Sequence, residues 1–67
     1  MNKPELLKEI DAFQLRSGMS DYALGKAASN DGHLIRRLRE TKMDPRLSTV
    51  AKIKGAMEQF ERALENG

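Results

Sequence analysis

The fold is decided by residues 19–38, which read MSDYALGKAASNDGHLIRRL. Apolar residues recur here at spacings of three and four, from Leu24 to Ala28 and again from Leu34 to Leu38, as on one face of an α-helix. The turn formers Ser-Asn-Asp-Gly at 29–32 separate the two segments. Two short helices joined by so short a turn cross steeply, so the stretch predicts a helix-turn-helix at about residues 20–40.

The first of these two helices has clear start and packing signals. Ser20 can accept a hydrogen bond from a first-turn amide, and Asp21 suits the positive end of the helix dipole. Gly25 stands one turn into the helix, where the crossing needs a small residue. Tyr22 and Lys26 are expected to face outward. The inward positions are expected to be Leu24, Ala27 and Ala28.

In the second helix, Asn30 or Asp31 is the expected cap. Its buried stripe is predicted to be Leu34, Ile35 and Leu38. The opposite side, at 100° per residue, then carries His33, Arg36, Arg37 and Glu40, with Arg39 on the flank.

Helical periodicity continues on both sides of this motif. An N-terminal helix is predicted to begin near Pro4, after Asn2 or Lys3, and to end before Gly18. Its apolar face is formed by Leu6, Leu7, Ile10 and Phe13. Residues 41–47 read as a loop because proline at 45 blocks a smooth helical passage. The last helix is expected from Ser48 to Glu65, with Gly55 as a place where it can bend. Its apolar stripe is Val50, Ile53, Met57, Phe60 and Leu64.

Composition excludes several classes of protein. The 67 residues include no cysteine and one histidine, so neither a disulfide nor a protein-only metal site is expected. No apolar run is long enough for a membrane span or a signal-peptide core, which favours a cytoplasmic protein. No nucleophile with a neighbouring base is identifiable, so we expect no enzyme, no cofactor and no small-molecule ligand.

The positive charge is concentrated in the middle of the chain. Residues 26–54 hold eight basic and three acidic side chains, a net charge of +5, although the whole chain carries only +2. A basic centre between acidic flanks is typical of a polyanion binder, but such a charge run can also simply solvate a helix.

Residues 19–38 also resemble, without a gap, the helix-turn-helix of the lambda-repressor/Cro (XRE-like) family. Leu24-Gly25, Ala28, Ile35 and Leu38 fall where that family keeps its apolar and small residues, and residues 45–50, PRLSTV, resemble its connector into a fourth helix. The resemblance implies a single all-α domain over residues 1–67, with four or five helices around the central motif. It also implies binding of double-stranded DNA and regulation of transcription, as a small repressor.

The resemblance implies that the helix after the turn enters the major groove. Base contacts are then expected from Asn30, Gly32, His33, Arg36 and Arg37. Asp21 departs from the family by placing a carboxylate where a neutral side chain often meets phosphate. Phosphate contacts are therefore assigned to Ser20, Tyr22, Lys26, Arg39, Lys42 and Arg46. Family members often carry alanine at the position of Gly25, so alanine is expected to be accepted there.

Two alternatives stay open. The last helix can pack entirely on the first one, or Phe60 and Leu64 can lie exposed and form a homodimer contact on a palindromic DNA site. The same scaffold can also serve as a protein-interaction module, such as an adaptor or an antitoxin-like partner.

Overall fold

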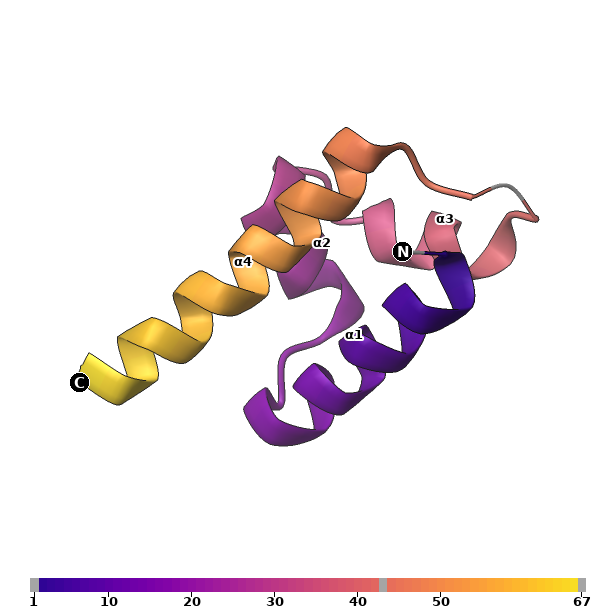
Figure 1. Cartoon of the computed structure of the whole chain (residues 1–67). Helices are drawn as coiled ribbons and strands as arrows, with labels where there is room; N and C mark the ends of the chain where they lie inside the picture. The colour runs from indigo at the N-terminus through magenta and orange to yellow at the C-terminus, as the bar shows by residue number, and fades with distance from the viewer. Residues whose placement is uncertain (1, 43, 67) are drawn as a thin grey trace.

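The computed structural model describes residues 2–42 and 44–66, which form four helices and no strand (Figure 1). In chain order the helices are α1 (Lys3–Ser17), α2 (Asp21–Ser29), α3 (Leu34–Glu40) and α4 (Leu47–Asn66). The expected all-α class is therefore confirmed for the described residues. Met43, which falls within the predicted loop, lies outside them.

Local hydrogen bonds set the ends of α1 and α2 where the sequence predicts them. The Asn2 side chain accepts from a first-turn amide of α1 at 3.0 Å, and the Ser20 hydroxyl accepts from one of α2 at 3.1 Å. The helices end on residues with a left-handed backbone, Gly18 at φ 73° and Asn30 at φ 54°. Start caps of this kind are each worth about 1 kcal/mol.

The start of α3 differs from the prediction. Its cap is His33, which makes no side-chain capping bond, and neither Asn30 nor Asp31 takes that place. Asp31 instead closes the preceding turn, since its Oδ1 accepts from the His33 amide at 3.0 Å. Because Asn30 already ends α2 with its left-handed backbone, the chain uses the residues up to His33 to reverse direction before a new helix begins.

Two further expectations on helix boundaries and faces need correction. α4 begins at Leu47, one residue before Ser48, and continues as one helix through Gly55. Ala27 is exposed, because the other helices cover only the narrow stripe of α2 that carries Leu24.

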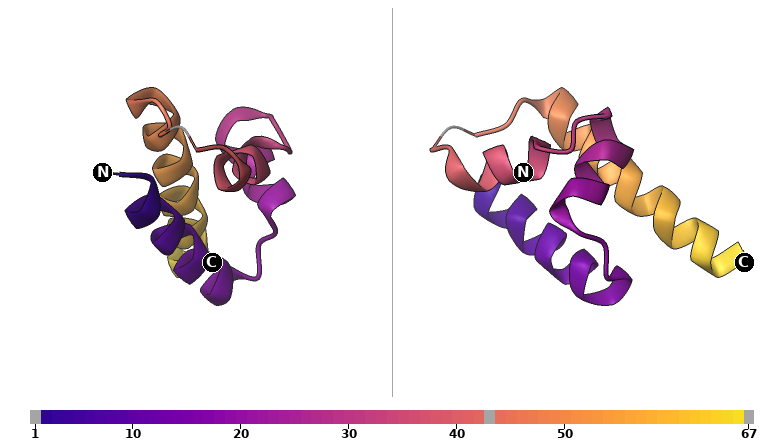
Figure 2. Two further views of the ribbon diagram at one scale, coloured as in Figure 1. Left: turned by 90° about the vertical axis from the view of Figure 1, so that its right-hand side faces the viewer. Right: turned by 180° about the vertical axis from the view of Figure 1, so that it is seen from behind.

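One apolar core joins the four helices. Its buried members are Leu6, Ile10, Phe13, Leu24, Ile35, Leu38, Val50, Ile53 and Met57. α2 packs against both α3 and α4, and the left view of Figure 2 shows α2 and α3 on one side of the molecule with α1 and α4 on the other. Each fully buried large apolar side chain contributes about 1.5–3 kcal/mol, so this core positions the helix-turn-helix.

Gly25 lies at the crossing of α2 with the segment that leads into α3. A Cβ built on it would stand 2.3 Å from the carbonyl oxygen of Asp31 and 3.4 Å from the Cβ of Leu34. The nearest atom belongs to the main chain, so it cannot move aside as the end of a flexible side chain can. The predicted role of Gly25 at the crossing is confirmed, but the expectation that alanine fits there is wrong.

Candidate nucleic-acid interface

The outer face of α3, which we define as His33, Arg36 and Arg37, is exposed to solvent. Ile35 and Leu38 are buried on the opposite side of the same helix. Three side chains that can donate hydrogen bonds therefore project from a helix that the core holds from behind. This is the face that the sequence assigns to base contacts.

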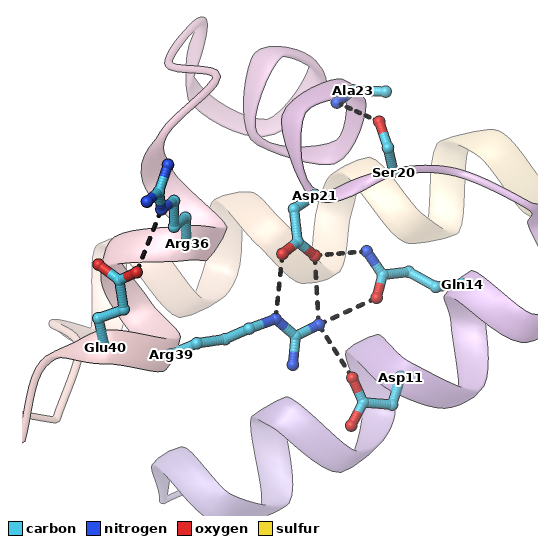
Figure 3. Close-up of polar contacts among 8 residues, drawn as sticks. All are labelled: Asp11, Gln14, Ser20, Asp21, Ala23, Arg36, Arg39 and Glu40. Atoms are coloured by element: carbon cyan, nitrogen blue, oxygen red, sulfur yellow. Dashed lines mark hydrogen bonds and ion pairs between the residues drawn. The ribbon is translucent and has the colours of Figure 1, made fainter.

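Arg36 and Arg37 pair with different carboxylates. Arg36 Nε donates to Glu40 Oε1 at 3.1 Å, within α3 (Figure 3). Arg37 Nη2 donates to Oδ2 of Asp31, in the turn before the helix. Exposed pairs of this kind contribute only about 0–1 kcal/mol to stability. The two partners lie toward opposite ends of α3, Asp31 ahead of its first turn and Glu40 in its last turn.

Asp31 is held more firmly than Glu40. Its side chain is 32% exposed, against 65% for Glu40. The hydrogen bond from the His33 amide lowers the pKa of Asp31, and the bond and charge of Arg37 act in the same direction against the opposing effect of desolvation. Asp31 is therefore an anion at neutral pH.

Tyr22 links the first turn of α2 to the turn before α3. A Cβ built on Gly32 would lie 2.2 Å from Tyr22 Cε2, so the ring occupies the space that this glycine leaves free. The rings of Tyr22 and His33 meet edge to face with centroids 6.4 Å apart. Gly32 thus makes room for a side chain of the protein itself, and the structure gives no support to its expected contact with a base.

Arg39, which the sequence assigns to phosphate, lies instead at the centre of a polar network between α1, α2 and α3 (Figure 3). Its Nε and Nη2 each donate to Asp21 at 3.2 Å. Nη2 also contacts Asp11 Oδ1 at 2.9 Å and Gln14 Oε1 at 3.0 Å. Gln14 in turn donates to Asp21 at 2.7 Å. The contacts of Arg39 join three helices, so it serves the fold and is not a free phosphate ligand.

This network changes the electrostatics where α2 begins. Partial burial acts to raise the pKa of Asp21, but the hydrogen bonds from Arg39 and Gln14 and the charge of Arg39 outweigh it and hold that pKa below its usual range. The hydrogen bond with Asp21 raises the pKa of Arg39 in return. The carboxylate that the sequence places near the phosphate position is therefore charged, but a cation beside it offsets its charge.

The remaining cationic candidates are free of ion pairs with the residues that the structure describes. They are exposed and comprise Lys26 on α2 and Lys42 and Arg46 in the loop after α3. The Ser20 hydroxyl accepts the capping bond of α2 and retains its own proton to donate. Asn30 is exposed on its left-handed backbone.

Sequence reasoning missed Asp11 and Gln14. They lie on the polar face of α1, where such residues are ordinary, and no spacing along the chain relates them to Arg39. Only the packing of α1 against the helix-turn-helix brings them together, so no signal in the local sequence could have found them.

The apolar stripe of α4 divides between the core and the surface. Phe60 is half-buried and packs edge to face on Phe13, with ring centroids 5.7 Å apart. Leu64, one turn further, is 63% exposed. Of the two alternatives, internal packing therefore holds as far as Phe60 and leaves Leu64 on the surface.

Comparison of the chain with models of protein families, with curated proteins and with solved structures finds no match. Within the described ranges, no helix is long and apolar enough to cross a membrane. The same residues contain no group of three or more histidine, aspartate or glutamate side chains that could hold a metal ion. The function is therefore inferred from the geometry of the site itself.

Proposed function

We propose that this chain is a helix-turn-helix protein of the lambda-repressor/Cro kind, which binds double-stranded DNA through α3 and represses transcription in the cytoplasm. One observation carries the proposal: α2 crosses the approach to α3 at Gly25, which has no room for a side chain, while α3 turns His33, Arg36 and Arg37 to solvent. A helix anchored from behind in this way fits the major groove, where its N-terminal residues meet base edges.

The contacts divide into base reading and phosphate binding. Arginine presents a planar fork that matches O6 and N7 of guanine, and His33 can donate to an acceptor on a base edge. Lys26, Lys42 and Arg46 supply attraction to phosphate that is independent of sequence. The pairing of Asp21 with Arg39 supports this arrangement, because it offsets a negative charge that would otherwise repel the DNA backbone.

We further propose that two copies bind one site as a homodimer. A single α3 reads only a few base pairs, too few to stand out among genomic competitors. The exposed Leu64, next to the half-buried Phe60, offers an apolar contact for the second copy. The two α3 helices would then lie about 34 Å apart on one face of the duplex.

Selection of bound sites from a random DNA pool tests the proposal. We expect a recovered site with two-fold symmetry and an affinity that falls steeply with salt. Arg36→Ala and Arg37→Ala should weaken binding while each variant keeps the parent's helical circular-dichroism spectrum. Failure of the pool to enrich any sequence would overturn sequence-specific binding, and a site without symmetry that one copy saturates would overturn the dimer.

The second candidate is a protein-interaction module, an adaptor or antitoxin-like partner, which the exposure of Leu64 favours. Measuring binding affinity at increasing salt concentrations separates the two functions. Affinity for DNA depends steeply on salt, whereas an apolar contact between proteins hardly changes.

A further inference from the structure

We propose that Asp31 positions Arg37 to read the O6 and N7 edge of a guanine, whereas Arg36 grips phosphate. The inference rests on the proposed DNA binding, and it assigns different tasks to two adjacent arginines that the sequence alone cannot distinguish. Asp31 is a positioning residue here, since it acts through Arg37.

The first observation is where the carboxylate partners of the two arginines lie. Arg37 pairs with Asp31, ahead of the first turn of α3, whereas Arg36 pairs with Glu40 in the last turn. The N-terminal end of a recognition helix is the end that meets base edges, and the outer parts of the motif lie along the phosphates. Arg37 is therefore the arginine whose carboxylate partner lies at the reading end.

The second observation is how firmly each carboxylate is held. The main chain of Asp31 is bonded on both sides: its amide donates to the Gly25 carbonyl at 3.3 Å and its own carbonyl accepts from the Leu34 amide at 3.2 Å. Its Oδ1 also accepts from a main-chain amide at 3.0 Å. Glu40 has a longer side chain that is 65% exposed. A guanidinium held by a fixed partner loses less freedom when it binds, so Arg37 is the pre-organised one.

The third observation is what the pairing leaves free. Arg37 uses Nη2 for Asp31, and its Nε and Nη1 donate to no residue among those the structure describes. The guanidinium has five N–H donors in a fixed fork, so enough remain for the two acceptors of guanine. Asp31 also brings a negative charge close to the DNA, which lowers affinity for every sequence alike. Discrimination and overall affinity therefore depend on Asp31 in opposite directions.

Asp31→Asn tests this dependence, because its amide oxygen can still accept from the His33 amide while its charge is lost. We expect preference for guanine at one position of the selected site to fall by about tenfold, while affinity for random DNA rises. Arg37→Lys should lose the same preference without the gain in affinity. Glu40→Gln is the matched control, since it removes one negative charge from the partner of the other arginine, and it should raise affinity without changing base preference.

The proposal is wrong if Asp31→Asn and Glu40→Gln shift affinity for all sequences equally and leave the guanine preference intact. It is also wrong if Arg36→Lys, and not Arg37→Lys, removes that preference. Should the parent protein bind no DNA, the proposed function fails and this inference with it.

A measurement on the free protein distinguishes failure of this inference from failure of the proposed DNA binding. Nitrogen-15 relaxation of the guanidinium Nη groups, where Arg37 and not Arg36 donates to its partner, should show Arg37 more ordered than Arg36 in the free protein, and Asp31→Asn should remove the difference. Equal disorder of the two side chains in the parent would contradict pre-organisation by Asp31, whether or not the protein binds DNA.

Discussion

The outer face and the inner flank of α3 both carry arginines, but these arginines make different contacts. On the outer face, Arg36 and Arg37 are more than 60% exposed and each pairs with one carboxylate. On the inner flank, Arg39 is 31% exposed and contacts α1 and α2 at once. The role of an arginine here is set by which other helices reach it. The inner flank fixes where α3 lies, and the outer face is left for recognition.

The largest expected effect comes from disturbing the crossing on which both flanks depend. Gly25→Leu forces a side chain against the Asp31 carbonyl, where even a Cβ would stand at 2.3 Å. We expect a loss of about 3 kcal/mol, the upper end for overpacking, and a melting temperature lower by about 10 °C or more.

Gly55→Ala is the control for this experiment, because a Cβ on Gly55 meets nothing within 4 Å. It should raise stability by about 0.5–1 kcal/mol, since alanine is a better helix former than glycine in a helix interior. An unchanged melting temperature for Gly25→Leu would refute the assigned crossing.

The next effect separates the two flanks directly. Arg39→Ala leaves Asp11 and Asp21 without their shared cation and should lower the free energy of unfolding by about 1 kcal/mol, whereas Arg36→Ala should change it by less than about 0.5 kcal/mol. Urea unfolding measures both values. Equal losses in the two variants would show that the flanks do not differ in their contribution to the fold.

Lowering the pH tests the stabilising role of Arg39 in a second way. Because the pKa of Asp21 is lowered in the folded protein, its stabilising effect is present above its unfolded pKa of about 4 and is lost as the pH falls through the folded value. The stability difference between the parent and Arg39→Ala should therefore shrink below about pH 4. Asp31, whose pKa is also lowered, loses its contribution in acid equally in both proteins and so does not affect the difference. A difference that stays constant down to pH 2 would contradict the Asp21–Arg39 pairing.

The smallest effect is expected far from both flanks. Leu64→Ala should leave half-site affinity unchanged and reduce cooperative binding to a two-fold site, because Leu64 is available to a second copy. Adding Phe60→Ala should reduce it further and also cost stability, since Phe60 packs on Phe13. Leu15→Ala, at a residue 88% exposed on α1, is the control and should change neither property. Undiminished cooperativity in Leu64→Ala would remove this residue from the dimer contact.

The sequence predicts those structural features that depend on residues close together along the chain. The caps at Asn2 and Ser20 and the stop at Gly18 are readable from the sequence, because each involves residues within one helical turn. Gly25 was readable as well, since a short turn demands a small residue at the crossing.

The failures have equally physical causes. The start of α3 was misplaced because the Asp31 carboxylate bonds to the amide two residues on and so closes the turn instead of capping the helix. The sequence assigns Arg39 to phosphate because it does not reveal the partners of this residue. Those partners, Asp11, Gln14 and Asp21, come from two other helices. Helical periodicity predicts that Arg36 and Arg37 are exposed. Their different proposed tasks depend on how rigidly their carboxylate partners are held, which only the folded structure shows.

The ring of Tyr22 over Gly32 also gives the protein a built-in optical probe. The chain contains one tyrosine and no tryptophan, so its intrinsic fluorescence originates almost entirely at the contact between α2 and the turn before α3. The His33 imidazole stands edge to face with the emitting ring, so a base placed beside it should alter the emission. Ligand binding at this turn can therefore be followed by tyrosine quenching on the unlabelled protein, with no reporter added to the surface under test.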